Sequence, residues 1–238
     1  MTVVDAGRAL GERCRALWPD RPAPIGIARI SDVPAGVTVR TGLATSACQL
    51  WREATDGVFA MGSDHGLCPI GRVTQGFASG LPAGDPLVTA MVESGYVDPA
   101  EMSSMPTLPM GHQWMLYGPL DRLPVDAEAA VFLALPEQAM LLNEALGSAR
   151  LDRPRLEMLG RPTCAAVAAA IVDDAPRGSL ACTGARMFAG MQPGELLLVV
   201  PASSLEELDA ALDGTLAANQ RVATIDAAIR DQVHASRT

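Results

Sequence analysis

The sequence predicts one globular domain of the α+β or α/β class, with a mixed sheet flanked by helices. Three observations lead to this class. The chain has 238 residues, of which 49% are apolar and 19% charged, so it can bury a substantial core. Short apolar runs predict strands, and segments with apolar residues at helical spacing predict helices. The two kinds of segment alternate without the strict rhythm of a parallel βαβ fold.

The expected elements follow this pattern along the chain. Apolar runs beside proline or glycine predict strands at residues 24–30, 57–62, 114–120, 129–135 and 194–201. Helical spacing, closed in most cases by proline or glycine, predicts helices at residues 5–17, 48–54, 84–95, 136–147, 162–174 and from 204 into the 220s. Residues 98–114 hold three prolines and three methionines without a period, which predicts a long loop.

The charge balance and the residue types exclude several functions. The net charge of −9 argues against the basic face that nucleic acids and anionic membranes require. All 18 basic residues are arginine, which excludes a Schiff-base lysine and a lysine-containing phosphate loop. The sequence has neither a long apolar span nor a signal-peptide pattern, so we expect a cytoplasmic protein. In a reducing compartment, five cysteines favour metal binding or chemistry over disulfides.

Four of the cysteines occur in two similar pairs. Cys48 and Cys68 lie in "ACQLWREATDGVFAMGSDHGLCPIGR", and Cys164 and Cys182 lie in "TCAAVAAAIVDDAPRGSLACTGAR". In each segment a helix is expected to begin at the first cysteine, and the second cysteine enters a stretch with glycine and arginine. The repeat predicts a single domain over residues 1–238 that arose by internal duplication, with pseudo-symmetric halves at 1–118 and 119–238. Such halves would bring the four cysteines to one place. Cys14 has no partner in this pattern.

The surroundings of these cysteines favour thiolate ligands to a metal. A helix start stabilises a thiolate through the helix dipole. The glycine turns, which include Gly71 and Gly184, offer backbone N–H groups to the sulfur of a thiolate or a cluster. A zinc site is disfavoured because closely spaced cysteine pairs are missing. We therefore expect an iron–sulfur cluster of the 4Fe–4S type, against the alternative that the cysteines only pack in the core. The expected ligands are Cys48, Cys68, Cys164 and Cys182.

Three residues are candidates for catalysis. Asp64 and His65 shortly precede Cys68, where they would activate a thiol or supply a mixed ligand, unless they form a solvated turn. His112 lies in the expected long loop and is a candidate to gate a pocket, unless that loop only covers the core. The sequence therefore places its candidate catalytic residues close to Cys68 and on the loop.

Two arginines are candidates for cofactor or substrate binding. Arg72 and Arg186 each lie four residues after the second cysteine of a pair. They would balance the charge of a thiolate cluster or bind a substrate carboxylate, unless they lie on the ordinary surface. With Gly71 and Gly184 they make up the expected cofactor-binding set.

The chain resembles a bacterial and archaeal family known as domain of unknown function 169. The resemblance rests on landmarks spread over nearly the whole chain in the family's order: "PIGIARI", Cys48, "DHGLCPIG", "VFLALPEQAMLL", "PTCAAV" and "LACTGAR". It implies that the four positions of the two cysteine pairs are the family's recurring polar feature. This sequence departs from the pattern in its alanine and arginine content and in "TGAR". The family name supplies no reaction.

Three functions follow as alternatives. The first is an iron–sulfur enzyme that performs redox, sulfur-transfer or Lewis-acid chemistry on a small molecule. The second is a sensor or carrier that binds heme through Cys68 and Pro69. The third is a metal-free thiol or persulfide protein. Each of the three functions is compatible with a homodimer, and we expect neither nucleic acid nor a membrane as a partner.

Overall fold

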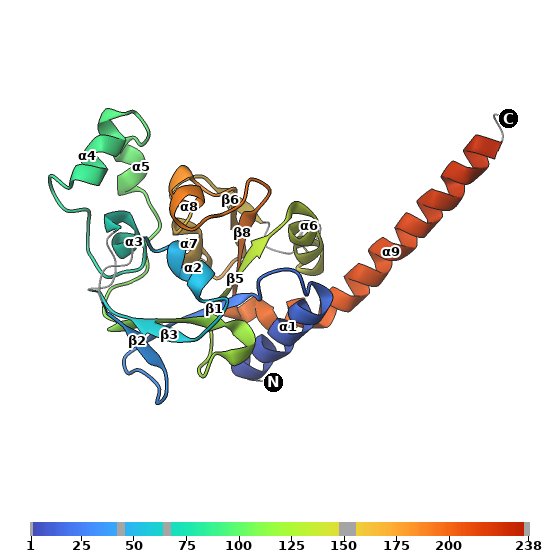
Figure 1. The fold of residues 1–238 in the computed structure, drawn as a ribbon, viewed down its shortest axis with the longest axis horizontal. Coiled ribbons are helices and arrows are strands. Elements are labelled where there is room, and N and C mark those ends of the chain that lie inside the picture. The colour runs from blue at the N-terminus through green and yellow to red at the C-terminus, as the bar shows by residue number, and fades with distance from the viewer. Residues whose placement is uncertain (1, 42–45, 64–67, 148–155, 236–238) are drawn as a thin grey trace.

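The computed structural model describes residues 2–41, 46–63, 68–147 and 156–235. Within these residues the strands form one eight-stranded mixed sheet in the order β2-β3-β4-β1-β5-β8-β7-β6 (Figure 1). The strands are β1 (Ile25–Ile30), β2 (Thr38–Arg40), β3 (Phe59–Met61), β4 (Trp114–Pro119), β5 (Ala129–Ala134), β6 (Glu157–Leu159), β7 (Arg177–Ser179) and β8 (Leu196–Pro201).

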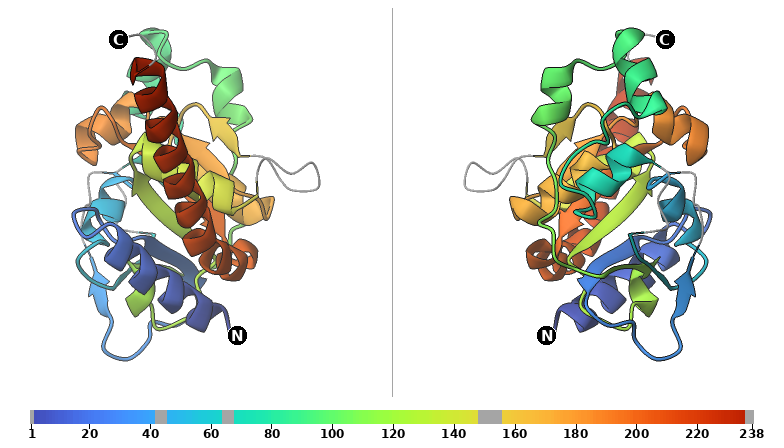
Figure 2. Two further views of the ribbon diagram at one scale, coloured as in Figure 1. Left: turned by 90° about the vertical axis from the view of Figure 1, so that its right-hand side faces the viewer. Right: turned by 90° about the vertical axis from the view of Figure 1, so that its left-hand side faces the viewer.

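Helices cover both faces of this sheet (Figures 1 and 2). One core cluster joins the sheet to α1, α6 and the start of α9, and the other joins it to α2, α7 and α8. The helices are α1 (Val3–Leu17), α2 (Gln49–Glu53), α3 (Pro69–Thr74), α4 (Pro86–Glu93), α5 (Pro99–Ser103), α6 (Pro136–Ala145), α7 (Ala165–Val172), α8 (Thr183–Phe188) and α9 (Leu205–Ala235), with short 3-10 helices η1 (Leu120–Arg122) and η2 (Ala202–Ser204).

The central strands are buried on both sides, which explains their apolar sequences. In β5 all six residues are buried; Ala129, Val131 and Leu133 belong to the core under α2, α7 and α8. Their neighbours Ala130 and Phe132 belong to the opposite core. Side chains alternate between the two faces of a strand, so a continuous apolar run is what a doubly covered strand requires.

The strand order is the same in both directions from the centre of the sheet. Outward from β1 the order is β4, β3, β2, and outward from the neighbouring β5 it is β8, β7, β6. The corresponding pairs also run in the same sense: β2 with β3 and β6 with β7 are parallel, and the inner pairs are antiparallel. A short 3-10 helix follows both β4 and β8, whereas α6 between β5 and β6 has no counterpart between β1 and β2. The order is what two related halves would produce; the duplication itself stays a prediction.

The mixed α+β class is confirmed, and the structure corrects several element predictions. The five strands expected from apolar runs correspond to β1, β3, β4, β5 and β8. The loop expected at 98–114 is wrong at its start, because Pro99–Ser103 forms α5, with Asp98 and Glu101 in a capping box. The expectation also missed β2, β6 and β7, which have three residues each and are too short to show a period.

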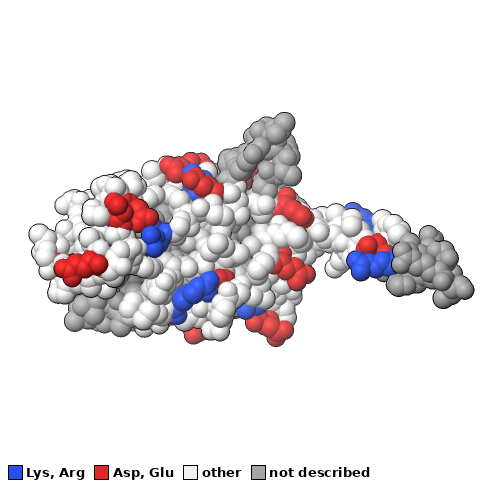
Figure 3. Space-filling view, turned by 90° about the horizontal axis from the view of Figure 1, so that it is seen from above, with Lys and Arg blue, Asp and Glu red and all other residues white. Residues whose placement is uncertain are grey.

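The surface agrees with the acidic composition. On the face shown in Figure 3, acidic and basic side chains are scattered among uncharged ones, and in several places the two signs lie next to each other. Among the described residues, none of the helices combines the length and apolar character that crossing a membrane demands.

Candidate functional site

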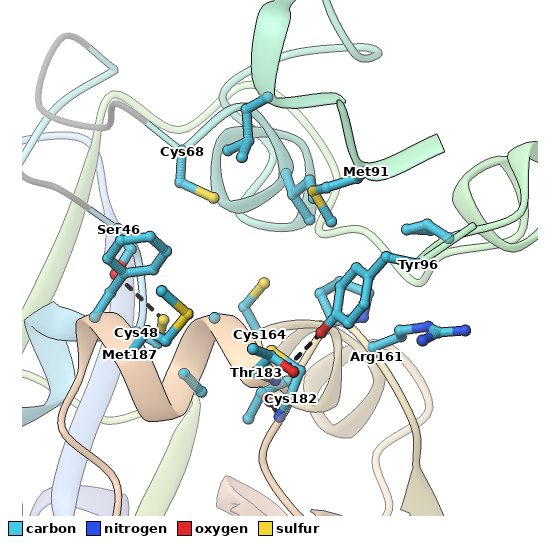
Figure 4. Close-up of a pocket in the computed structure, with 18 of the residues that line it drawn as sticks. Ser46, Cys48, Cys68, Met91, Tyr96, Arg161, Cys164, Cys182, Thr183 and Met187 are labelled. Atoms are coloured by element: carbon cyan, nitrogen blue, oxygen red, sulfur yellow. Dashed lines mark hydrogen bonds between the residues drawn. The ribbon is translucent and has the colours of Figure 1, made fainter. Parts of the chain in front are cut away.

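A pocket of about 530 Å³ lies between the helices on one face of the sheet and the two helices α4 and α5 (Figure 4). Cys48, Cys68, Cys164 and Cys182, called here the pocket cysteines, all line it. The paired pattern predicted that these four residues would share one place, and the structure confirms that prediction. Most of the other lining side chains are apolar.

The first cysteine of each pair immediately precedes a helix that packs on the sheet. Cys48 precedes α2 and Cys164 precedes α7, and neither caps its helix with its side chain. The Sγ of Cys48 lies 3.2 Å from the hydroxyl oxygen of Ser46, and either atom can be the donor. Both helices bury apolar residues against the sheet, so the positions of these two sulfurs are set by core packing.

The second cysteine of each pair is the N-cap residue of a short helix. The backbone N–H of Gly71 points to the Sγ of Cys68 at a distance of 3.5 Å, at the start of α3. The backbone N–H of Cys182 donates a 2.6 Å hydrogen bond to the hydroxyl oxygen of Thr163. The second pair is thereby tied together through the residue that precedes Cys164.

The two expected glycines differ in the space around them. A Cβ on Gly71 would lie 2.6 Å from the Cβ of Ala47, so glycine is required for α3 to approach the segment before Cys48. A Cβ on Gly184 would meet its nearest neighbour, the Sγ of Cys182, at 3.8 Å, which is ordinary contact. Gly184 lines the pocket, and Gly71 contacts it through the sulfur of Cys68.

Burial makes Cys48, Cys68 and Cys164 weaker acids than ordinary thiols. Burial raises the pKa of Cys48 to about 11, and it raises the pKa of Cys68 and, more strongly, that of Cys164. Hydrogen bonds from Ser46 and Thr74 oppose the increase at Cys48 and Cys164 respectively. Thiolate charge on any of the other three raises the pKa of Cys164 further, so the sulfurs lie within electrostatic range of one another.

The described side chains do not form a ready metal site. No three His, Cys, Asp or Glu residues in the described part of the chain converge as ligands of one metal ion. Ligation by the pocket cysteines therefore requires their side chains to rotate toward a common point.

The remaining candidate residues lie elsewhere. Asp64 and His65 fall outside the described residues. His112 does not line the pocket; its ring lies 4.8 Å from that of Phe77, and burial lowers its pKa, as does the charge of Arg29.

The two candidate arginines also lie outside the pocket lining. Arg186 donates hydrogen bonds of 2.6 Å to the carbonyl oxygens of Leu180 and Gln192, so it holds the backbone around α8. Arg72 is partly buried on α3, and its Nε has no hydrogen-bond partner among the described residues. Among the described residues, neither arginine forms a hydrogen bond with a sulfur of the pocket cysteines.

Cys14 lies on the opposite face of the sheet, in the core formed with α1. Burial raises the pKa of its thiol to about 12. The unpaired cysteine is therefore separated from the pocket by the sheet.

The sequence patterns did not identify the wall of the pocket that faces the cysteines, which α4 and α5 form. Leu87 and Met91 of α4, Met102 of α5 and Met105 line it. Arg161 and Glu101 form an ion pair of 3.4 Å at its edge. Two features of the sequence could have indicated this wall: the spacing of apolar residues after the capping residue Asp85, and the cluster of methionines.

A protein-family model matches most of the chain. A family model described as DUF169, uncharacterised ArCR, matches residues 21–210, which include the pocket cysteines. An uncharacterized protein of Methanocaldococcus jannaschii is 31% identical over 100 residues, which are 41% of this chain and 43% of that protein. The match thus spans less than half the length of this relative. No solved structure matches the chain.

Proposed function

The chain belongs to the DUF169 family, whose description names no reaction, and from the site we propose that the pocket cysteines hold an iron–sulfur cluster. In this proposal the protein is an enzyme that acts on a small molecule bound in the same pocket. The observation that carries this proposal is the meeting of four cysteines from two distant parts of the sequence in one apolar pocket. Thiolate sulfur is the ligand type that iron–sulfur clusters use.

The raised pKa of Cys48 favours a metal over a free thiol at this position. With a pKa of about 11, about one Cys48 side chain in ten thousand is ionised at pH 7. A buried, protonated thiol is a poor nucleophile, which disfavours the metal-free thiol or persulfide alternative. A metal displaces these protons and offsets the mutual repulsion of the thiolates, so the same burial is compatible with ligation.

The protein would contribute position and shielding. A cluster held there would supply redox, sulfur-transfer or Lewis-acid chemistry. The N–H of Gly71 would tune the charge on the sulfur of Cys68, as second-sphere donors do. The apolar walls would exclude water and place a substrate against the sulfur-lined part of the pocket.

Anaerobic isolation and reconstitution test the proposal. We expect iron, acid-labile sulfide and broad visible absorption in the wild-type protein and in Cys14→Ser, the control. Replacing any pocket cysteine by serine should reduce all three. Wild-type protein that retains neither iron nor sulfide would contradict the proposal.

The pocket also supports a second candidate, a heme bound through the thiolate of Cys68. Cys68 is partly exposed, precedes Pro69 and opens into an apolar cavity of about 530 Å³. One axial thiolate suffices for heme iron. A sharp Soret band without acid-labile sulfide, lost in Cys68→Ser alone, would favour heme over the cluster.

We also propose that two copies associate through α9. Asn219 donates a hydrogen bond to Glu144 of α6, and beyond it the helix projects from the body (Figures 1 and 2). Val222, Ile225 and Ile229 on this projection are 65%, 58% and 53% exposed. Their spacing is that of positions a, d and a of a heptad, the seam of a coiled coil.

The charges beside this seam fit a parallel second copy. In that heptad Arg221 occupies position g and Asp226 position e, and parallel coiled coils pair g with the following e of the partner helix. Asp226 also binds Arg230 of its own helix at 2.7 Å, but this exposed pair is weak enough to exchange.

Light scattering of the full chain tests the association. We expect a dimer that Ile225→Glu dissociates and that Val172→Glu, at a similarly exposed position on α7, leaves intact. Arg221→Glu or Asp226→Arg alone should weaken the dimer, and the two together should restore it. A monomeric wild type, or a combined variant as weak as the single ones, would contradict the parallel arrangement.

A further inference from the structure

Helices α4 and α5 form a roof over the pocket that is apolar yet buries none of its own residues. Leu87, Ala90 and Met91 stand at i, i+3 and i+4 on one face of α4 and line the pocket, and Met102 of α5 lines it too. An apolar helix face is stabilised when it is covered. The pocket volume of about 530 Å³ lies in the range of small-molecule sites, so a small apolar ligand is of the size that would cover this face.

At one edge the roof is joined to α8 and to the segment before α7. The backbone N–H of Thr183 donates a 3.2 Å hydrogen bond to the hydroxyl oxygen of Tyr96. Arg161 lies over the ring of Tyr96, 4.8 Å from its centroid, and pairs with Glu101 of α5. In Figure 4, Tyr96 and Arg161 lie side by side at one end of the view, and Cys48 lies at the other. The pocket therefore has a polar end formed by Tyr96 and Arg161, and its sulfur-lined part extends from Cys182, beside that end, to Cys48.

The polar end holds an arginine whose partner is easily replaced. Among the described lining residues, Arg161 is the one basic residue and Glu101 the one acidic residue. Their closest atoms are 3.4 Å apart, longer than a charge-assisted hydrogen bond, and both side chains are about half-exposed. A ligand carboxylate could take the place of Glu101 and form a bidentate pair with the guanidinium.

We propose that the pocket binds an elongated, apolar monocarboxylate, with its carboxylate on Arg161 and its apolar part against the methionines of the roof. Methionine side chains adapt to ligands of different shape, which suits a chain or a ring system of this kind. The monocarboxylate proposal names a substrate class for the proposed function and rests on that function, because the apolar part of the ligand would lie against the pocket cysteines. Binding itself needs no metal.

Titration calorimetry on the metal-free full-length protein tests the proposal with decanoate, decanol and decylamine. We expect decanoate to bind about tenfold more tightly than decanol, because it alone forms a charge-assisted pair with Arg161. Decylamine should bind most weakly. Arg161→Gln should reduce decanoate affinity about tenfold and leave decanol unchanged, and Glu101→Gln should strengthen decanoate binding by removing its competitor.

Two further variants keep the result interpretable. Arg122→Gln, an exposed arginine outside the pocket, should leave all three affinities unchanged. Met91→Asp should weaken decanoate and decanol alike, because it places a charge on the apolar wall. Circular dichroism of each variant shows whether it is folded.

The outcomes separate this proposal from the metal centre. Decanoate binding no tighter than decanol binding, or an equal loss of both in Arg161→Gln, would overturn the monocarboxylate. Retained iron with no saturable binding of any of the three probes would overturn it also, and would leave the cluster standing. Specific decanoate binding by a protein that takes up no iron would support the monocarboxylate and remove the cluster.

Discussion

The backbone N–H of Cys182 donates a 2.6 Å hydrogen bond to the hydroxyl oxygen of Thr163, the residue before Cys164. The first pair has its own contact at the corresponding position: Ala47, the residue before Cys48, lies against Gly71 in the first turn of α3. In both pairs the residue before the first cysteine thus fixes the segment that carries the second. One contact is a hydrogen bond and the other is close packing, so the two pairs should respond to different substitutions.

Thr163→Val should destabilise the protein and loosen the second pair. Thr163 is 1% exposed and Cys182 is partly buried, so the valine would leave the N–H of Cys182 without its partner in a partly buried place. We expect a loss of about 1–3 kcal/mol in the free energy of unfolding, measured by urea denaturation. Thr163→Ser keeps the hydroxyl and should lose much less. Equal losses in the two variants would show that the hydrogen bond is not responsible.

Gly71→Ala should disturb the first pair by overpacking. The new Cβ would lie 2.6 Å from that of Ala47, so α3 must move away from the segment before Cys48. Overpacking of this kind costs about 1–3 kcal/mol, measurable in the same denaturation experiment, and iron uptake should fall with it. Gly184→Ala, where the nearest atom is 3.8 Å away, is the matched control and should be tolerated. A Gly184→Ala variant as unstable as Gly71→Ala would refute the steric argument.

The cysteine replacements should divide into two classes. Serine at Cys48, Cys68, Cys164 or Cys182 should lower the iron and sulfide content, because each would remove a thiolate ligand. Serine at Cys14 should cost stability through its buried hydroxyl but leave the iron content unchanged, because Cys14 lies in the core on the other face of the sheet. Metal analysis and thermal unfolding measure the two effects separately. Similar iron losses at all five positions would contradict the assignment of ligands.

Glu195 should stabilise the fold in a pH-dependent way. Burial alone would raise the pKa of this carboxyl, but hydrogen bonds from the N–H of Gln192 and from Arg21, with the charge of Arg52, hold it below its ordinary value. Arg21 lies 2.7 Å from the carboxylate, and Arg52 of α2 contacts its other oxygen. A lowered folded-state pKa means that the stabilisation is complete above the unfolded-state pKa of about 4.3 and is lost as the pH falls through the folded value.

The variant Glu195→Gln tests this at two pH values. At pH 7 it should lose about 1.5–3 kcal/mol in the free energy of unfolding, because two partly buried arginines lose the charge of their partner. Below about pH 4 the difference from the wild type should shrink. Glu157→Gln, an exposed partner of Arg177, should change little at either pH. A constant difference at both pH values would show that the charge of Glu195 is not what stabilises the fold.

Local patterns made part of the fold predictable from the sequence. The buried strands could be predicted because both of their faces are covered, which gives continuous apolar runs such as that of Ala129–Ala134. The outer strands, such as Thr38–Arg40, are defined by pairing with neighbours that are distant in the sequence, so three residues carried no signal. The pocket cysteines could be grouped because the similar surroundings of the two pairs lie within short segments.

The rest of the site depends on contacts that no local pattern contains. Arg161, Tyr96 and Glu101 meet only because the roof lies over the start of α7. Arg186 was a candidate ligand-binding residue from its position after Cys182, but its actual partners are two backbone carbonyls. Sequence position showed which residues accompany the cysteines, whereas the direction of each side chain is set by the tertiary packing.

Native mass spectrometry of the reconstituted protein, without exposure to oxygen, shows whether each chain carries a cluster. We predict that each wild-type or Cys14→Ser chain carries the added mass of one iron–sulfur cluster, and that this mass is lost when a pocket cysteine is replaced by serine. A wild-type protein that shows only the mass of the bare chain after reconstitution, or one that carries heme instead, would contradict the claim that Cys48, Cys68, Cys164 and Cys182 hold a cluster.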